Sequence, residues 1–189
     1  MLDLIALDLS LFRDINGLAG HRVWLDALGI FAARWLIFVI AAAAAWPLLV
    51  SLVRRESRRE VRQARRLAFA ALLATIMSFG FNWIVSLIRF RHRPFAVLPD
   101  VHLLVPTPLT AHSFPSSHSA IAFALAFAVL LARRSYGLAL LVLAVGVAFG
   151  RVFVGVHYPL DVVAGIFVGL GCAALAVRLD NAAGWVKSK

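Results

Sequence analysis

Long apolar stretches separated by short charged segments constrain the fold of this chain more than any other feature of its sequence. Residues 34–53 and 67–88 can each cross a membrane, since a helical crossing takes about 20 consecutive apolar residues. Shorter apolar stretches follow at 116–132, 136–149 and 160–177. Hydrophobic residues make up 62% of the 189 residues and charged residues only 15%, so a soluble domain would lack polar surface. The sequence therefore predicts an all-α membrane bundle of about five transmembrane helices, in a single domain over residues 1–189.

The first 33 residues have a different composition, because charged side chains recur among the apolar ones. The charged residues in this segment include Asp8, Arg13, Asp14, Arg22 and Asp26. This mixture predicts an N-terminal amphipathic helix that lies at the membrane interface. Gly17 and Gly20 are expected to interrupt it, since glycine is a poor helix former.

The net charge of +10 is concentrated in a few connections. Seven arginines crowd into the segment after residue 53: Arg54, Arg55, Arg58, Arg59, Arg62, Arg65 and Arg66. Such a cluster between apolar stretches is typical of a cytoplasmic loop in contact with membrane lipids, and we expect no nucleic-acid partner. Five crossings place all the basic segments on the cytoplasmic side. These segments are this loop, Arg133–Arg134 and the tail residues Arg178, Lys187 and Lys189. The loop 89–114 and the connection 150–159 then face the opposite side.

Two pairs of glycines stand four residues apart within the apolar stretches. Gly146 precedes Gly150, and Gly165 precedes Gly169. Small residues at this spacing predict close packing between helices.

Ionisable side chains near a membrane are functional candidates, because they are costly to hold there. They gather in 89–95, 113–118 and 150–161, all on the predicted non-cytoplasmic side. In the last segment His157 precedes Asp161 by four residues, so the carboxylate can accept a hydrogen bond from one imidazole nitrogen. That bond would fix the tautomer and leave the other nitrogen free to attack. The alternative is an interfacial histidine beside an aspartate that caps a helix.

The segment 113–118 introduces the predicted helix at 116–132. Pro115, Ser116 and Ser117 open this helix, and the free N–H groups of a helix start bind anions. His118 in the first turn is a candidate general acid for a leaving oxygen. A capping serine and a snorkelling histidine are the alternative interpretation.

The segment 89–95 contributes guanidinium groups. Arg93 offers a planar fork that fits two phosphate oxygens, whereas Arg89 and Arg91 are interpreted as interface anchors. Together, the three segments supply arginine clamps, a helix start, two histidines and a carboxylate. These are the components that phosphoryl transfer needs, since positioning and charge neutralisation dominate that reaction.

These residues resemble the type 2 phosphatidic acid phosphatase superfamily of membrane lipid phosphatases. The motifs of that family are Lys-x6-Arg-Pro, Pro-Ser-Gly-His and Ser-Arg-x5-His-x3-Asp. The corresponding segments here are Ser86-x6-Arg93-Pro94, Pro115-Ser116-Ser117-His118 and Gly150-Arg151-x5-His157-x3-Asp161. The motif-bearing core therefore spans residues 86–161.

The resemblance implies a role for each matching residue. His157 would attack phosphorus and form a phosphohistidine, Asp161 would orient it, and His118 would protonate the departing lipid oxygen. The phosphate oxygens would be held by Arg93, Arg151, Ser116 and Ser117. The resemblance implies no metal ion and no other cofactor.

Three positions depart from the family motifs. Ser86 replaces the lysine, and Arg89, three residues later on the same helical face, is the candidate to supply its charge to the phosphate. Ser117 replaces glycine and Gly150 replaces serine, which removes one hydroxyl donor.

Within the family, the chain resembles bacterial undecaprenyl-diphosphate phosphatases of the bacitracin-resistance type. The short length, the Arg-Pro-Phe run at 93–95 and the segment Phe12-Arg-Asp-Ile-Asn-Gly17 carry this resemblance. It implies a multi-pass protein of the bacterial inner membrane that regenerates the cell-wall lipid carrier on the outer face.

Three alternatives remain open. The same chemistry could act on phosphatidylglycerophosphate, phosphatidic acid or a lipid A phosphate. The chain could instead be a transporter of anionic lipids, although it lacks evident repeat symmetry. His118, His157 and Asp161 could also bind zinc or iron, a site that the surrounding arginines disfavour.

The loop 94–113 could cover the site, guide a polyprenyl chain or serve only as a connection.

Overall fold

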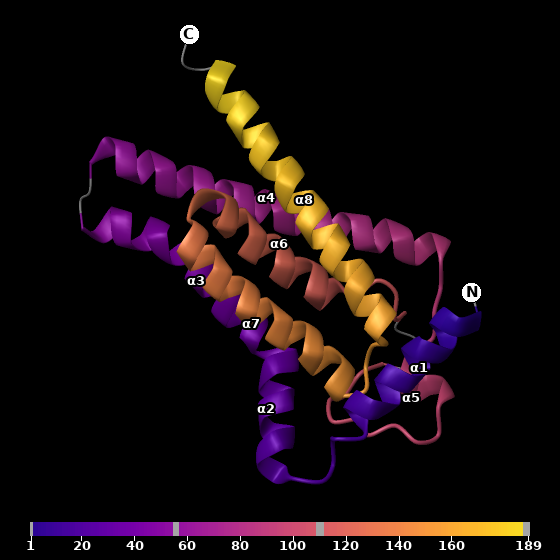
Figure 1. Ribbon diagram of the computed structural model, residues 1–189. Helices are drawn as coiled ribbons and strands as arrows, with labels where there is room; N and C mark the ends of the chain where they lie inside the picture. The colour runs from indigo at the N-terminus through magenta and orange to yellow at the C-terminus, as the bar shows by residue number, and fades with distance from the viewer. Residues whose placement is uncertain (1, 55–56, 109–111, 187–189) are drawn as a thin grey trace.

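The computed structural model describes residues 2–54, 57–108 and 112–186, and all regular secondary structure in these ranges is helical. The elements are α1 (Leu2–Asn16), α2 (Val23–Arg34), α3 (Leu36–Val53), α4 (Arg58–Ile88), α5 (Pro94–Val97), α6 (Ser117–Ala132), α7 (Arg134–Phe153) and α8 (Pro159–Val186). The predicted all-α fold is confirmed (Figure 1).

Among the described residues, four helices are long and apolar enough to cross a membrane: Leu36–Val53, Arg58–Ile88, Arg134–Phe153 and the part of α8 from Pro159 to Ala183. Helix α6 is also apolar, and at 16 residues it is shorter than these four. It packs against α4, α7 and α8 in the middle of the bundle, with most of its residues buried (Figure 1). Each of the five predicted apolar stretches is largely helical, although the first, predicted from residue 34, begins in α2 and is interrupted at Trp35, and Ser116 precedes α6.

The arginine cluster is largely helical, contrary to its prediction as a loop. Helix α4 begins at Arg58, inside the cluster, because Ser57 and Glu60 form a capping box. The Ser57 backbone N–H donates to the Glu60 carboxylate at 3.0 Å, and the Glu60 N–H donates to the Ser57 hydroxyl at 3.4 Å. Arg55 lies outside the described residues, as do Lys187 and Lys189 of the predicted basic tail.

Close contacts at both glycine pairs confirm the packing prediction. A side chain at Gly165 would collide with the Ser116 carbonyl oxygen, and one at Gly169 would collide with that of Ala120. Both contacts bring α8 against α6. A side chain at Gly150 would collide with the backbone nitrogen of Ala33, which brings α7 against α2.

The N-terminal segment forms two helices, and the break between α1 and α2 includes both predicted glycines, Gly17 and Gly20. Helix α1 has an unusual amphipathic pattern, because its protein-facing side is polar. Asp8, Phe12 and Asn16, spaced by four residues, are each at most 2% exposed. Its exposed side chains include Leu4, Ile5, Leu7 and Leu11. This pattern suits a helix whose apolar face contacts lipid at the membrane interface.

Asn16 anchors the end of α1 to the end of α7. Its amide nitrogen donates to the carbonyl oxygens of His102 at 2.9 Å and Phe153 at 2.8 Å, and its oxygen accepts from the His102 N–H at 3.0 Å. The chain then turns at Gly155, whose φ of +83° is a left-handed conformation that favours glycine. These bonds fix the start of the connection between α7 and α8.

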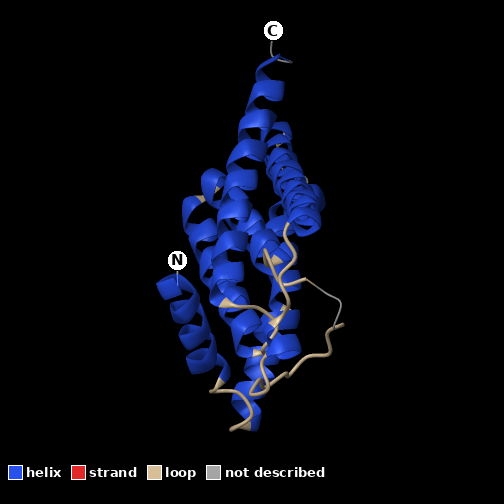
Figure 2. Cartoon of the chain, turned by 90° about the vertical axis from the view of Figure 1, so that its right-hand side faces the viewer, coloured by secondary structure: helices blue, strands red, loops and turns tan. Residues whose placement is uncertain are grey.

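The starts of α6 and α8 and the end of α7 lie at the same end of the bundle (Figure 1). The loops gather toward the end away from the C-terminus (Figure 2). The opposite end carries the start of α4 and the C-terminal part of α8, which are joined by the ion pair between Arg66 and Asp180 at 2.8 Å. The three motif segments therefore meet at one end of the bundle.

Gly169 and Gly171 allow a matched test of the α6–α8 contact. We expect Gly169→Leu to lower the free energy of unfolding by about 1–3 kcal/mol, since overpacking a tight interface costs this much. Gly171→Leu is the control, because no atom lies within 4 Å of the added Cβ. Thermal unfolding in detergent measures both variants. Equal losses of melting temperature would contradict the proposed importance of this contact.

Candidate active site

His157 and Asp161 lie together in the protein interior. His157 stands in the connection between α7 and α8 and is 3% exposed, whereas Asp161 lies in the first turn of α8 and is fully buried. The imidazole Nδ1 is 3.9 Å from the carboxylate Oδ2, which is too long for a hydrogen bond. The sequence correctly brings the two residues together, but the predicted direct bond is absent and the Ser113 hydroxyl contacts both groups instead.

The Asp161 carboxylate is bound on both oxygens. Oδ2 accepts from the Ser113 hydroxyl at 2.5 Å and from the Tyr158 N–H at 2.9 Å. Oδ1 accepts from the Arg91 guanidinium at 2.6 Å. A buried carboxylate held by a cation and two further donors stays ionised and has one orientation.

Burial lowers the pKa of His157 to about 4, and the positive charges of Arg151 and Arg93 act in the same direction against the attraction of Asp161. The imidazole is therefore neutral at pH 7. A neutral ring has a free lone pair on one nitrogen, which a nucleophile requires.

The start of α6 is tied to the start of α8. The Ser116 N–H donates to the Asp161 carbonyl oxygen at 2.9 Å, and the buried Ser116 hydroxyl accepts from Ser119 at 3.0 Å. The Ser117 hydroxyl accepts from the Asn82 amide of α4 at 3.3 Å. His118 follows in the first turn of α6. The helix start that was predicted to bind an anion thus lies beside His157 and Asp161.

Arg93 and Arg151 place two guanidinium groups near this helix start without a carboxylate partner among the described residues. Arg93 donates to the Val156 carbonyl oxygen at 3.3 Å, and Arg151, 7% exposed, donates to that of Ala33 at 3.1 Å. Each retains a buried Nε with no hydrogen-bond partner. Burial also lowers the pKa of Arg93. Two poorly satisfied guanidinium groups, that of Arg151 buried and that of Arg93 partly buried, favour the binding of an anion beside them.

Arg89 is placed differently from the other predicted phosphate ligands. Its side chain is exposed, and its guanidinium lies over the Phe114 ring, 5.5 Å from the centroid. Ser86, at the position of the family lysine, donates its hydroxyl to the Trp83 carbonyl oxygen of its own helix. Among the described hydrogen bonds, neither residue contacts the buried group formed by His157, Asp161 and Ser113.

Sequence reasoning missed three residues that contact the cluster. Arg91, interpreted as an interface anchor, instead forms ion pairs of 2.6 Å with both Asp161 and Asp8. Ser113 was named only as part of its segment. Asp8 could have been found from its spacing to Phe12 and Asn16, since a carboxylate on one face with two buried residues needs a cationic partner.

The described residues contain no group of three or more histidine, cysteine, aspartate or glutamate side chains arranged to hold a metal ion. The Asp161 oxygens are directed to Arg91, Ser113 and Tyr158.

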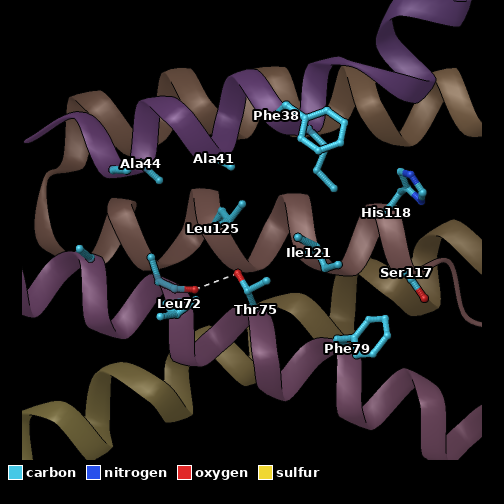
Figure 3. Close-up of a pocket in the computed structure, with 14 residues that line it drawn as sticks. Phe38, Ala41, Ala44, Leu72, Thr75, Phe79, Ser117, His118, Ile121 and Leu125 are labelled. Carbon is cyan, nitrogen blue, oxygen red and sulfur yellow. Dashed lines mark hydrogen bonds between the residues drawn. The ribbon is translucent and has the colours of Figure 1, made fainter. Parts of the chain in front are cut away.

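An apolar groove of about 530 Å³ leads away from His118 between α3, α4 and α6. Ser117 and His118 lie at one end, and the groove continues past Phe38, Ile121 and Leu125 toward Ala44 (Figure 3). Its one further hydroxyl, on Thr75, donates to the Ala71 carbonyl oxygen of its own helix. The groove therefore offers hydrocarbon surface along its length and polar groups only beside His118.

Comparison with known proteins agrees with this geometry. The PAP2 superfamily model matches residues 63–185, which include every motif residue. The chain belongs to the PAP2 superfamily. It is 31% identical to undecaprenyl-diphosphatase BcrC of Bacillus subtilis over 91% of this chain and 83% of that protein. It is 32% identical to the putative undecaprenyl-diphosphatase YbjG of Escherichia coli over 90% of this chain and 82% of that protein.

The crystal structure of Aquifex aeolicus LpxE is similar to this fold, with a TM-score of 0.68 and 25% identity over 91% of this chain and 95% of that chain. These findings identify the protein as a multi-pass membrane enzyme, a lipid phosphatase of the PAP2 superfamily.

The lowered pKa of His157 predicts that its ring stays neutral as the pH falls from 7 to about 4 and becomes protonated only below that value. Nitrogen-15 NMR of histidine-labelled protein in detergent, with the signal assigned through His157→Gln, measures this directly. A protonation midpoint at or above the usual value of about 6.5 would contradict the buried, desolvated environment.

Proposed function

We propose that this PAP2 phosphatase hydrolyses undecaprenyl diphosphate to undecaprenyl phosphate and inorganic phosphate. The observation that carries the proposal is the apolar groove that ends at His118, near the guanidinium groups of Arg93 and Arg151, which have no carboxylate partner among the described residues. A long hydrocarbon chain suits the groove, and a diphosphate suits the cations. Relatives named undecaprenyl-diphosphatase, which are 31% and 32% identical to this chain over about nine tenths of its length, support this substrate.

The proposed first step transfers the terminal phosphoryl group to His157. The free imidazole nitrogen attacks the terminal phosphorus, and the bond from phosphorus to the bridging oxygen breaks. His118 donates a proton to that oxygen, which leaves as undecaprenyl phosphate. A phosphohistidine remains, with Asp161 orienting the ring and compensating its charge.

The second step hydrolyses the phosphohistidine. His118, now deprotonated, takes a proton from a water molecule that attacks phosphorus. The nitrogen–phosphorus bond breaks, inorganic phosphate is released, and both histidines return to their initial states.

Arg93, Arg151 and the start of α6 at Ser116 and Ser117 are proposed to hold the phosphate oxygens. The unpartnered Nε atoms of the two arginines support this role. The serine-to-glycine change at Gly150 suits the fold, because a side chain there would collide with the backbone of α2 at Ala33. We assign no phosphate contact to Arg89, since it is exposed over Phe114.

The orientation in the membrane follows from charge. The arginine cluster at the start of α4 lies at the opposite end of the bundle from His157 and Asp161. Because basic segments remain in the cytoplasm, the active site is proposed to face the outer side of a bacterial inner membrane. Diphosphate released outside during cell-wall synthesis would reach it there, which makes the enzyme a recycler of the lipid carrier.

Phosphate release from undecaprenyl diphosphate by purified protein tests the proposal. We expect release to persist in EDTA and His157→Gln to reduce it by on the order of 10³-fold or more, since it removes the nucleophile. His92→Gln, an exposed histidine nearby, is the control and should retain activity. Faster turnover of phosphatidylglycerophosphate, phosphatidic acid or a lipid A phosphate would reassign the substrate. Dependence on an added divalent ion, or undiminished release by His157→Gln, would overturn the mechanism.

The groove predicts a dependence on chain length. Ala45 lines the groove seven residues beyond Phe38 on α3, so Ala45→Phe should obstruct a long chain and spare a short one. We expect kcat/KM for undecaprenyl diphosphate to fall about tenfold, a usual penalty for poor fit in an apolar pocket, and that for geranyl diphosphate to remain unchanged. Ala42→Phe is the control, since Ala42 is exposed on the same helix outside the groove. Equal effects on both substrates would contradict the assignment.

A further inference from the structure

We propose that Asp8, Arg91 and Ser113 are positioning residues that hold the Asp161 carboxylate and, through Ser113, the His157 ring. The inference rests on the catalytic roles proposed above for His157 and Asp161. It assigns the N-terminal helix α1, which lies outside the family-matched residues 63–185, to the active site.

The single proton of the Ser113 hydroxyl determines the first link. Ser113 is fully buried, and its Oγ lies 2.5 Å from the Asp161 Oδ2 and 3.4 Å from the His157 Nδ1. The carboxylate can only accept, so Ser113 donates its proton to Asp161. A hydrogen bond across the 3.4 Å contact then requires the proton to be on the His157 Nδ1, which donates to Ser113. The proposed network therefore holds the ring as the Nδ1–H tautomer, with the lone pair on Nε2.

The backbone fixes Ser113 itself. Its N–H donates to the Arg91 carbonyl oxygen at 2.8 Å, so the loop before α6 is held against the segment that follows α4. Ser113 and Arg91 therefore approach Asp161 together, one at each carboxylate oxygen.

Arg91 makes the second link, to helix α1. Its Nη1 donates to Asp161 and its Nη2 donates to Asp8, both at 2.6 Å. The guanidinium also lies over the Tyr158 ring, 3.9 Å from the centroid. A planar fork shared by two carboxylates has one orientation, which a lysine ammonium would not reproduce.

Asp8 completes the network. It is 2% exposed, and its second oxygen accepts from the Leu160 N–H at 2.8 Å, in the first turn of α8. Phe12, one turn later on α1, packs against the Tyr158 ring with centroids 5.4 Å apart. Helix α1 thus contacts Tyr158 and Leu160, two of the three residues between His157 and Asp161, and its Asp8 carboxylate binds the Arg91 guanidinium.

The test compares Asp8→Asn, Arg91→Gln and Ser113→Ala in steady-state hydrolysis of undecaprenyl diphosphate. We expect kcat to fall by on the order of 10²-fold for Arg91→Gln, as for other small misplacements of reacting groups, with a much smaller change in KM. The Asp8→Asn/Arg91→Gln double variant should be no slower than Arg91→Gln alone, since both changes break one network. Asp14→Asn and Ser135→Ala, exposed residues on α1 and α7, are controls that should match wild type.

Nitrogen-15 NMR separates positioning from a general role in folding. Wild-type His157 should show a protonated Nδ1, and Ser113→Ala should populate the Nε2–H tautomer in a protein that still folds and unfolds cooperatively, although at a lower temperature because a buried hydrogen bond is lost. Ser113→Ala removes only the hydroxyl group, so it tests whether Ser113 positions the His157 ring even if Arg91→Gln fails to fold. Unchanged kcat in Arg91→Gln, or an unchanged tautomer in Ser113→Ala, would overturn the inference.

The two proposals fail in different ways. If His157→Gln is as active as wild type, the proposed function fails. If His157→Gln is inactive while Asp8→Asn, Arg91→Gln and Ser113→Ala all match wild type, only the positioning network is refuted.

Discussion

The contact between the starts of α6 and α8 is the constraint on which the active site depends. Gly165 allows the α8 backbone to reach the Ser116 carbonyl oxygen, and the Ser116 N–H donates to the Asp161 carbonyl oxygen at 2.9 Å. Residues of the second and third motifs, about 40 positions apart in the chain, thereby become neighbours. A larger residue at Gly165 would separate the helix start that is proposed to bind phosphate from the histidine that is proposed to attack it.

The arginines at this end of the bundle differ in their partners, because one is paired with carboxylates and two are bound only to backbone carbonyls. Asp161 and Asp8 are both satisfied by one cation, Arg91. Arg93 and Arg151 are left with backbone carbonyls alone. Had either arginine paired with Asp161, that guanidinium would have fewer donors left for a phosphate group. Because Arg91 pairs with both aspartates, Arg93 and Arg151 have no carboxylate partner among the described residues.

The membrane explains why α1 turns its polar side inward. In water, a helix that buries Asp8 and Asn16 and exposes Leu4 and Leu11 would be unfavourable. At a lipid interface the same pattern is favourable, since the leucines contact hydrocarbon and the polar groups find partners in the protein. Sequence analysis identified the amphipathic segment correctly from its charges. It could not identify what Asp8 binds. Helical periodicity shows which residues share one side of a helix, but it does not show which other segment that side contacts.

The sequence by itself determined the helical stretches, the close-packing glycines and the residues of all three motifs, since apolar length, small residues and motif spacing are local properties of the chain. The tertiary structure alone decided how those residues are connected. It placed Ser113 between His157 and Asp161, moved Arg91 from an expected anchor to an ion pair with two aspartates, and left Arg89 exposed over Phe114. The physical reason is that each of these contacts joins different segments of the chain, so its geometry exists only after α1, α6 and α8 have packed together.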